Sequence, residues 1–167
     1  MTPATTNLSG RLKACRGVLV DSNVLLDVAT NDPNWGEWSA RALAEIAENA
    51  PLMINPIVYA EVSVGYSTIE ALDAAIPAAL YRREALPWEA GFLAGKCFVR
   101  YRRRGGLRQS PLPDFYIGAH AAIGRLALLT RDAARYRSYF PGVEIIAPTT
   151  PTPGRPPASS RTSPRAR

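Results

Sequence analysis

Several short runs of apolar residues set the strongest limit on what this chain can fold into. They occupy residues 17–20, 51–55, 126–130 and 143–148, and segments with helical spacing separate them. Runs this short and apolar are typical of strands buried on both faces, and their alternation with helices is typical of a parallel sheet. We therefore predict an α/β fold with three α/β/α layers around a short central parallel sheet.

Helices are predicted between these runs. Apolar spacing, initiating prolines and terminal glycines place them at residues 35–50, 56–65, 67–77, 87–104, 114–124 and 131–140. Residues 83–86 are predicted to form a further short strand. Asp114 stands where the N-cap of the 114–124 helix is expected.

The composition favours one folded domain with two tails. Of the 167 residues, 47% are hydrophobic, which is enough for one substantial core. We predict a domain over residues 17–148, a flexible N-terminal extension over 1–16, and a disordered tail over 149–167. That tail is rich in Pro, Ser and Arg and carries no large apolar residue.

The cysteines and the hydropathy narrow the class of protein further. Cys15 and Cys97 have no metal-binding spacing and suggest no disulfide framework, which fits a reducing compartment. No apolar run reaches the length of a membrane span, and we do not expect a signal peptide. These features predict a cytoplasmic protein that does not associate with membranes.

The net charge of +6 conceals a strong polarity along the chain. Residues 17–90 contain 3 basic and 11 acidic residues, whereas residues 91–148 contain 10 basic and 3 acidic residues. This separation suggests an acid-lined pocket beside a surface that binds a polyanion. The alternative is that both groups of charges lie on solvated helix faces.

Four acidic residues are candidates for a common site. Asp21 follows the first strand and Asp132 follows the 126–130 strand, so in a parallel sheet both lie at the same edge, where ligands bind. Glu61 lies in an unusually apolar helical segment, and Asp114 precedes buried-looking residues. Capping also explains each aspartate taken singly, and an arginine partner would explain Glu61.

A cluster of carboxylates needs a compensating charge. Like charges raise one another's pKa values, and a divalent cation reverses that effect. Hard oxygen ligands without His or Cys favour Mg²⁺, or Mn²⁺, over Zn²⁺. His120, the single histidine, is predicted to have a structural or surface role, and Asp27, Asp32 and Asp73 are interpreted as ordinary surface or turn acids.

Four segments of the chain resemble PIN-domain ribonucleases, and among these the VapC-type toxins of toxin–antitoxin pairs. They are "VLVDSNVLLD", "NPIVYAEVSVGY", "LPDFYIGAHA" and "LALLTRDAARYRSYFPGVEIIAP", and they stand in the family's order over about residues 17–148. The most specific part is D-x-x-I-x-A-x-A followed by L-x-T-x-D, in which 18 positions separate Asp114 from Asp132.

The resemblance implies a PIN-like fold and a set of roles. Asp21, Glu61, Asp114 and Asp132 are similar to the family's catalytic, metal-binding acids, with Asn23 and Thr130 as supporting polar residues. It further implies Mg²⁺-dependent cleavage of RNA by metal-activated water, a cognate antitoxin and a homodimer. Which acid acts as general base, and whether one or two metals bind, remain open.

A basic segment just before Asp114 is the predicted RNA-binding surface. It contains Arg100, Arg102, Arg103, Arg104 and Arg108 around Tyr101. Arginines bind phosphates, and an exposed tyrosine can stack on an unpaired base. A solvated helix end, or a surface for an acidic antitoxin segment, would also explain these arginines.

Two other functions are compatible with parts of the pattern. A catalytically silent PIN-like module would bind RNA or protein only, and the presence of all four acids argues against it. A phosphatase using Asp21 as nucleophile is disfavoured, because Asn23 stands where such enzymes place a second aspartate.

Overall fold

The computed structural model describes residues 8–149, and its centre is a five-stranded parallel sheet. The strands are β1 (Val18–Val20), β2 (Leu52–Ile54), β3 (Tyr81–Arg83), β4 (Ala127–Leu129) and β5 (Ile145–Ile146). Their order is β3-β2-β1-β4-β5, and Val18 aligns with Leu52 on one side and Ala127 on the other. The predicted parallel sheet is confirmed.

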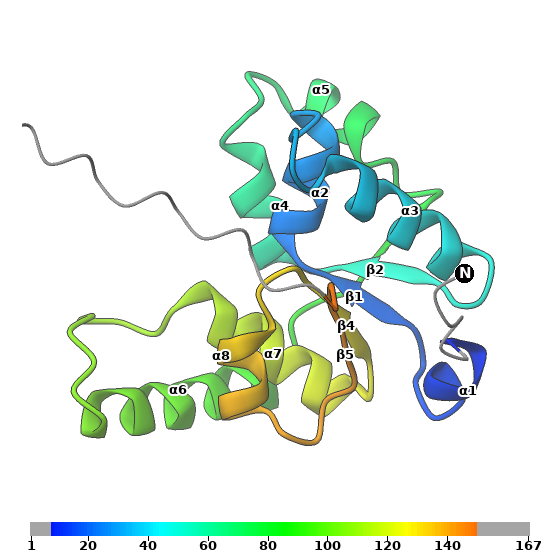
Figure 1. Cartoon of the computed structure of the whole chain (residues 1–167). Coiled ribbons are helices and arrows are strands. Elements are labelled where there is room, and N and C mark those ends of the chain that lie inside the picture. Colours follow the sequence, from blue (N-terminus) through cyan, green and yellow to red (C-terminus); the bar gives the residue numbers. More distant parts are fainter. Residues whose placement is uncertain (1–7, 150–167) are drawn as a thin grey trace, which may run out of the picture.

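Helices cover both faces of this sheet. They are α1 (Leu8–Leu12), α2 (Ser22–Ala29), α3 (Gly36–Ala47), α4 (Pro56–Ser63), α5 (Ile69–Ala75), α6 (Trp88–Arg103), α7 (Pro113–Gly124) and α8 (Ala133–Tyr139). Figure 1 shows α2 to α5 on one side of the strands and α6 to α8 on the other. The predicted three-layer α/β/α class is therefore confirmed.

The sheet explains why its strands are short and wholly apolar. Every residue of β1, β2 and β4 is buried, because helices pack on both faces and the edge strands flank them. The chain first builds outward from β1 through β2 to β3, and then returns to the other side of β1 for β4 and β5. The change of direction lies between β1 and β4, the place where open α/β sheets bind ligands.

Helix α8 is held against α7 by a close contact at a glycine. A Cβ atom on Gly118 would lie 2.2 Å from the ring of Phe140, the residue that follows α8. Only a residue without a side chain therefore allows the ring this position. Gly118 and Phe140 are both buried, so this contact holds α8 in one position beside the carboxyl edge of the sheet.

The N-terminal segment differs from the sequence-based expectation. Residues 1–16 were expected to form a flexible extension, but Leu8–Leu12 forms α1, and Leu12 is buried in the core. Arg11 forms an ion pair with Glu144 and donates a hydrogen bond to the backbone oxygen of Ile145 beside the edge strand β5. The apolar Leu12 and the cation of Arg11 together explain the attachment. Residues 1–7 and the predicted tail, from residue 150 on, lie outside the described part.

Smaller differences concern element boundaries. The strand predicted at residues 83–86 is Tyr81–Arg83, so it begins earlier. Asp114 is not the cap of α7, because the helix begins at Pro113 and Leu112 occupies the N-cap position. Among residues 8–149, no helix is both long and apolar enough to cross a membrane.

Leu12→Ala tests whether α1 belongs to the fold. Removing a buried leucine side chain typically costs about 2–5 kcal/mol, and we expect about 2–3 kcal/mol at this peripheral core position. Chemical denaturation measures the loss, with Lys13→Ala at the exposed neighbouring position as the control. Equal stability of the two variants would contradict the attachment of α1.

Candidate active site

Asp21 is the most constrained acid in the structure. It follows β1, its backbone N–H donates to the oxygen of Leu129 on β4 (2.9 Å), and its side chain is buried. Three donors converge on its Oδ2 atom: Nδ2 of Asn23 at 3.0 Å, Oγ1 of Thr130 at 2.8 Å and the hydroxyl of Tyr136 at 3.1 Å. Asp21 occupies the N-cap position of α2, but its side chain makes no capping bond. The carboxylate is directed to the sheet edge instead.

Glu61 reaches the same place from α4. Its Oε2 atom accepts a hydrogen bond from the hydroxyl of Ser22 at 2.8 Å, and that hydroxyl also lies 3.5 Å from Oδ1 of Asp21. Ser22 thus bridges the two acids, which come from segments 39 positions apart in the sequence. Glu61 is partly buried, in agreement with its apolar sequence surroundings.

Asp114 approaches from the first turn of α7. Its Oδ2 atom forms an ion pair with Arg135 of α8. Its negative charge raises the pKa of both Asp21 and Glu61, although burial contributes more to each shift. The structure therefore brings three of the four predicted acids, Asp21, Glu61 and Asp114, into one electrostatic neighbourhood.

Asp132 is linked to these three acids through Thr130. It is exposed at the N-cap position of α8, where its backbone N–H donates to Oγ1 of Thr130 at 3.1 Å. Among residues 8–149, its carboxylate has no hydrogen bond or ion pair to another acid-site residue. Its link to the site runs through Thr130, which itself bonds Asp21.

The surroundings of Asp21 raise the pKa of its carboxyl group well above the usual value. Burial raises its pKa, the Thr130 hydrogen bond opposes that shift, and the charge of Asp114 adds to it, so that the pKa reaches about 6. Burial also raises the pKa of Glu61, against the hydrogen bond from Ser22. Perturbed carboxyl groups gathered at a sheet edge are typical of functional sites.

The donors present fit a hard divalent cation. All are carboxylate oxygens, and the mutual repulsion of Asp21, Glu61 and Asp114 would be relieved by a cation between them. In the described part of the chain, no group of three or more His, Cys, Asp or Glu side chains already stands at metal-binding geometry. At Asp114, the guanidinium of Arg135 supplies a compensating positive charge.

The supporting residues lie where the sequence predicted them. Asn23 donates to both Asp21 and Thr130, and its Oδ1 atom accepts the backbone N–H of Arg131 at 3.3 Å. Asn23 thereby connects the start of α2 with the loop that follows β4. His120 is buried and pairs with Asn55 at 3.1 Å, in agreement with its predicted structural role.

Ser22, Arg135 and Tyr136 were missed by the sequence reasoning. Ser22 stands beside Asp21 in the sequence, but nothing in the pattern shows that its hydroxyl turns to Glu61. Arg135 and Tyr136 belong to a short helical pattern with several other polar residues. Nothing in that local pattern shows that the hydroxyl of Tyr136 reaches Asp21, which lies 115 positions away.

Asp27 is a correction to the sequence interpretation. It was expected to be an ordinary surface acid, but its side chain is only 3% exposed. One oxygen accepts from the hydroxyl of Ser39 at 2.9 Å and the other pairs with Arg131 at 3.0 Å. Asp27 therefore ties α2 to α3 and to the loop between Thr130 and Asp132.

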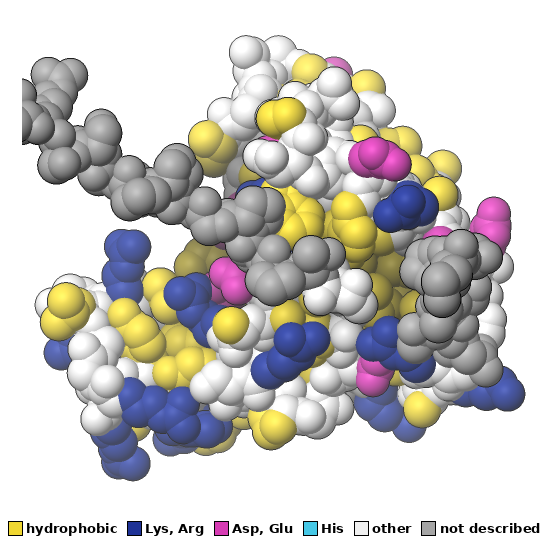
Figure 2. Space-filling view, in the orientation of Figure 1, with side chains coloured by type: hydrophobic (Ala, Val, Ile, Leu, Met, Phe, Trp, Pro, Cys, Tyr) yellow, Lys and Arg dark blue, Asp and Glu magenta, His cyan; other side chains and the backbone are white. Residues whose placement is uncertain are grey.

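Several arginines of the basic segment already contact other groups of this chain. Arg100 and Arg104 lie over the ring of Tyr139, at 5.5 and 5.3 Å, while Arg102 donates to the backbone oxygens of Gly106 and Arg108. These contacts leave positive charge at the surface, and Figure 2 shows Lys and Arg side chains gathered over the half of the molecule that carries α6 and α8.

Tyr101 is not the exposed stacking residue that was expected. Its ring lies 6.3 Å from that of Phe98 and 5.8 Å from that of Phe115, and Gly106 closes over it. Tyr101 therefore packs α6 against α7. Exposed Arg103 and Arg108 remain the members of the segment best placed to meet a polyanion.

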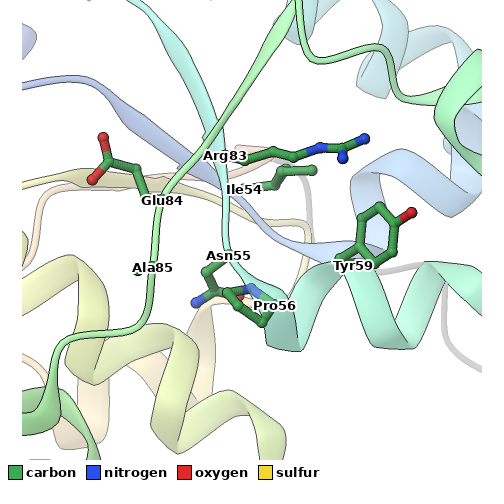
Figure 3. Close-up of a pocket in the computed structure, with 7 residues that line it drawn as sticks. All are labelled: Ile54, Asn55, Pro56, Tyr59, Arg83, Glu84 and Ala85. Carbon is green, nitrogen blue, oxygen red and sulfur yellow. The ribbon is translucent and has the colours of Figure 1, made fainter.

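A separate pocket lies beyond the carboxyl ends of β2 and β3. Its volume is about 260 Å³, and it is lined by Ile54, Asn55, Pro56, Tyr59, Arg83, Glu84 and Ala85. Figure 3 shows Arg83 extended toward Tyr59, and Glu84 pointing to the opposite side. Arg83 lies 5.1 Å from the ring centre of Tyr59, and none of the four predicted acids lines this pocket.

With this geometry in view, comparison with known proteins identifies the family. The sequence matches the PIN domain over residues 18–140, so the chain belongs to the PIN-domain family. PIN domains are generally nucleases. Comparison with curated proteins gave no match.

Solved structures share the fold at low sequence identity. A chain of VapBC2 from Rickettsia felis, bound to a promoter DNA fragment, is 17% identical with a TM-score of 0.61 and covers 78% of this chain and 97% of its own. A toxin–antitoxin complex from Klebsiella pneumoniae is 23% identical, with a TM-score of 0.56 and coverage of 78% and 96%. DNA-bound VapBC from Salmonella typhimurium is 18% identical, with a TM-score of 0.59 and coverage of 78% and 97%.

Asp21→Asn is expected to stabilise the fold when divalent cations are absent. The raised pKa means that the ionised carboxylate is disfavoured in the folded state, so wild type loses stability as the pH rises from about 4 to 6. A shift of about two pKa units corresponds to about 2–3 kcal/mol. In EDTA at pH 7.5 the variant should exceed wild type in unfolding free energy by that amount, and by nothing below about pH 4.

Asp73→Asn is the matched control for this measurement. Tyr59 and Arg83 lower the pKa of Asp73, so its ionised form is favoured in the folded state and the substitution should destabilise the fold at pH 7.5. Urea denaturation across the pH range measures both variants. A destabilised Asp21→Asn at pH 7.5 would contradict the description of Asp21 as a buried, disfavoured charge.

Proposed function

We propose that this PIN-domain protein is a divalent-metal-dependent endoribonuclease of the VapC type, the toxin of a toxin–antitoxin pair. The observation that carries the proposal is the convergence of Asp21, Glu61 and Asp114 at the carboxyl edge of the sheet, beside an arginine-rich surface. The family match supports nuclease activity. The solved structures of similar fold support the toxin part, since several are VapBC or toxin–antitoxin complexes.

The acids would hold Mg²⁺, with Mn²⁺ as an alternative. Asp21 and Asp114 are the proposed direct ligands, and Glu61 and Asp132 would contribute directly or through water. The bound cation would supply Lewis acidity toward a phosphodiester oxygen and lower the pKa of a water molecule. Asn23 and Thr130 keep the Asp21 carboxylate in place during the reaction.

RNA would be bound by the arginines of the α6 end and the following loop. Arg100, Arg103, Arg104 and Arg108 place positive charge next to the α7 end that carries Asp114. Arg135 is the basic residue nearest to the acids, and it would be free to contact a phosphate once a cation replaces it at Asp114. No nucleophilic side chain is required by this mechanism.

A catalytically silent module remains the second candidate. It is favoured by one observation, namely that Asp114 is already paired with Arg135 and needs no metal for charge compensation. Such a module would bind RNA or a protein partner without cleaving it. The cognate antitoxin and a homodimer stay predictions for both candidates.

RNA cleavage distinguishes the two functions. With Mg²⁺ or Mn²⁺, we expect wild type to cleave RNA, and Asp21→Asn and Asp114→Asn to lose more than about 100-fold in rate, since even losing a supporting contact at a metal site costs about 10–100-fold. Folding of each variant is verified by circular dichroism. Asp73→Asn, an acid substitution outside the site, should cleave at the wild-type rate. Unchanged cleavage by folded Asp21→Asn would refute the site.

The salt dependence of RNA binding tests the arginine surface. Each lost phosphate contact reduces the slope of log K against log salt by about 0.7 for a single strand, so Arg103→Ala should show that reduction. Arg41→Ala on the exposed face of α3 removes the same charge at a distance and should leave the slope unchanged. Fluorescence anisotropy in EDTA measures binding without cleavage, and identical slopes for the two variants would contradict this placement.

A further inference from the structure

The two oxygens of the Asp21 carboxylate have very different surroundings. Oδ2 accepts three hydrogen bonds, from Asn23, Thr130 and Tyr136. In the part of the chain that the structure describes, the only hydrogen-bond contact of Oδ1 is the 3.5 Å approach of the Ser22 hydroxyl. Three donors exceed the usual capacity of the two lone pairs on one carboxylate oxygen, so Oδ2 has none to spare for a cation.

The Oδ1 atom of Asp21 lies on the side of Glu61. The Ser22 hydroxyl that approaches Oδ1 donates its proton to Glu61 at 2.8 Å, so Oδ1 and Glu61 lie on the same side of the carboxylate. Rotation of the Asp21 side chain about its last bond would exchange the two oxygens. The three donors on Oδ2 oppose that rotation.

Tyr136 is distinct among these three donors. Asn23 and Thr130 belong to the chain segments that directly follow β1 and β4, whereas Tyr136 projects from α8. Its side chain is 2% exposed and its helix is fixed against α7 through Phe140 and Gly118. A buried phenol on a fixed helix has little rotational freedom, so its hydroxyl defines a fixed point for Oδ2.

We propose that Tyr136 is a positioning residue that holds Oδ2 of Asp21, so that Oδ1 is presented toward Glu61 as the oxygen that binds the cation. This inference rests on the proposed metal-dependent function. It assigns a role to a residue outside the acidic quartet, and it states which atom of Asp21 is the ligand. Tyr136 itself contacts neither the cation nor the substrate.

The neighbouring residue makes α8 the common support of two acids. Arg135 pairs with Asp114 while Tyr136 holds Asp21, so two consecutive residues of one helix contact both proposed direct ligands. When a cation takes Asp114, Arg135 is released but Tyr136 stays, because Oδ2 is not the oxygen that binds. The two contacts of α8 therefore behave differently on metal binding.

Tyr136→Phe tests the role with little change in packing. The substitution keeps the ring and removes the hydroxyl, and we expect the dissociation constant for Mn²⁺ to rise about 10-fold or more, as for other supporting contacts at metal sites. Electron paramagnetic resonance of free Mn²⁺, on the full chain at pH 8 without RNA, measures this constant. At that pH Asp21 is ionised in wild type, so positioning rather than protonation is probed.

Tyr81→Phe is the matched control. Tyr81 is also a buried tyrosine, but it lies on β3, which β2 separates from β1. Its substitution should leave the Mn²⁺ constant within about twofold of wild type. A purely structural role of Tyr136 predicts a lower melting temperature with unchanged Mn²⁺ affinity, and that result would overturn the inference.

A second measurement uses the wild-type protein and does not depend on the variant folding. Anomalous diffraction from crystals grown with Mn²⁺ should place the ion at Oδ1 of Asp21, with the Tyr136 hydroxyl still bonded to Oδ2. An ion at Oδ2, with Tyr136 displaced, would overturn the inference while leaving the metal-dependent function intact. Failure of wild type to bind Mn²⁺ at all would overturn the proposed function and, with it, this inference.

Discussion

The burial of one carboxylate, that of Asp21, organises the rest of the site. A charge removed from water is costly unless polar groups compensate for it, and here the compensation comes from three hydrogen-bond donors in three separate segments. The cost is still visible in the pKa of about 6. The end of β1, the loop after β4 and helix α8 must all be in place before this carboxylate is acceptable in the core. Burial of the Asp21 carboxylate therefore depends on the complete fold around it.

The topology of the sheet explains why this charge lies where it does. β1 is the central strand, with β2 on one side and β4 on the other, and the chain changes direction there. The connections leave in opposite directions, which opens a crevice beyond the ends of β1 and β4. Glu61 and Asp114 then enter from α4 and α7, the helices on opposite faces of the sheet that contact each other at this edge. The helix layers on both faces of the sheet therefore each contribute one acid to the site at the end of β1.

The sequence predicted the parts of the molecule that depend on local pattern. Short apolar runs and helical spacing were sufficient for the parallel sheet, and the position of Asp21 directly after such a run was sufficient to place it at the edge. Asn23 and Thr130 came from the resemblance to the PIN family, in which polar residues at these places in the motifs support the acids. Local chain geometry determines the strands, the helices and the position of Asp21, so these could be predicted from the sequence alone.

Side-chain partners across long sequence distances were not predictable in the same way. The contact between Tyr136 and Asp21 spans 115 positions, and Asp27 was misread because its partner Arg131 lies beyond three intervening strands. The N-terminal helix was missed because its apolar pattern is only one turn long, Leu8 and Leu12, yet Leu12 reaches the core. In each case the sequence around the residue gives no signal, because its role depends on a partner that is distant in the sequence and is brought near by the fold.

The site balances the charges of its acids in two different ways. Asp21 is compensated by hydrogen bonds from Asn23, Thr130 and Tyr136, of which Thr130 and Tyr136 are buried. Asp114 is compensated by Arg135, an exposed side chain with many alternative positions. On the proposed metal-dependent function, a cation could replace Arg135 without disturbing the core, whereas displacing the donors of Asp21 would leave the buried hydroxyls of Thr130 and Tyr136 unpaired. Under that proposal, the fixed acid and the exchangeable acid would together allow the site to form without metal and still accept one.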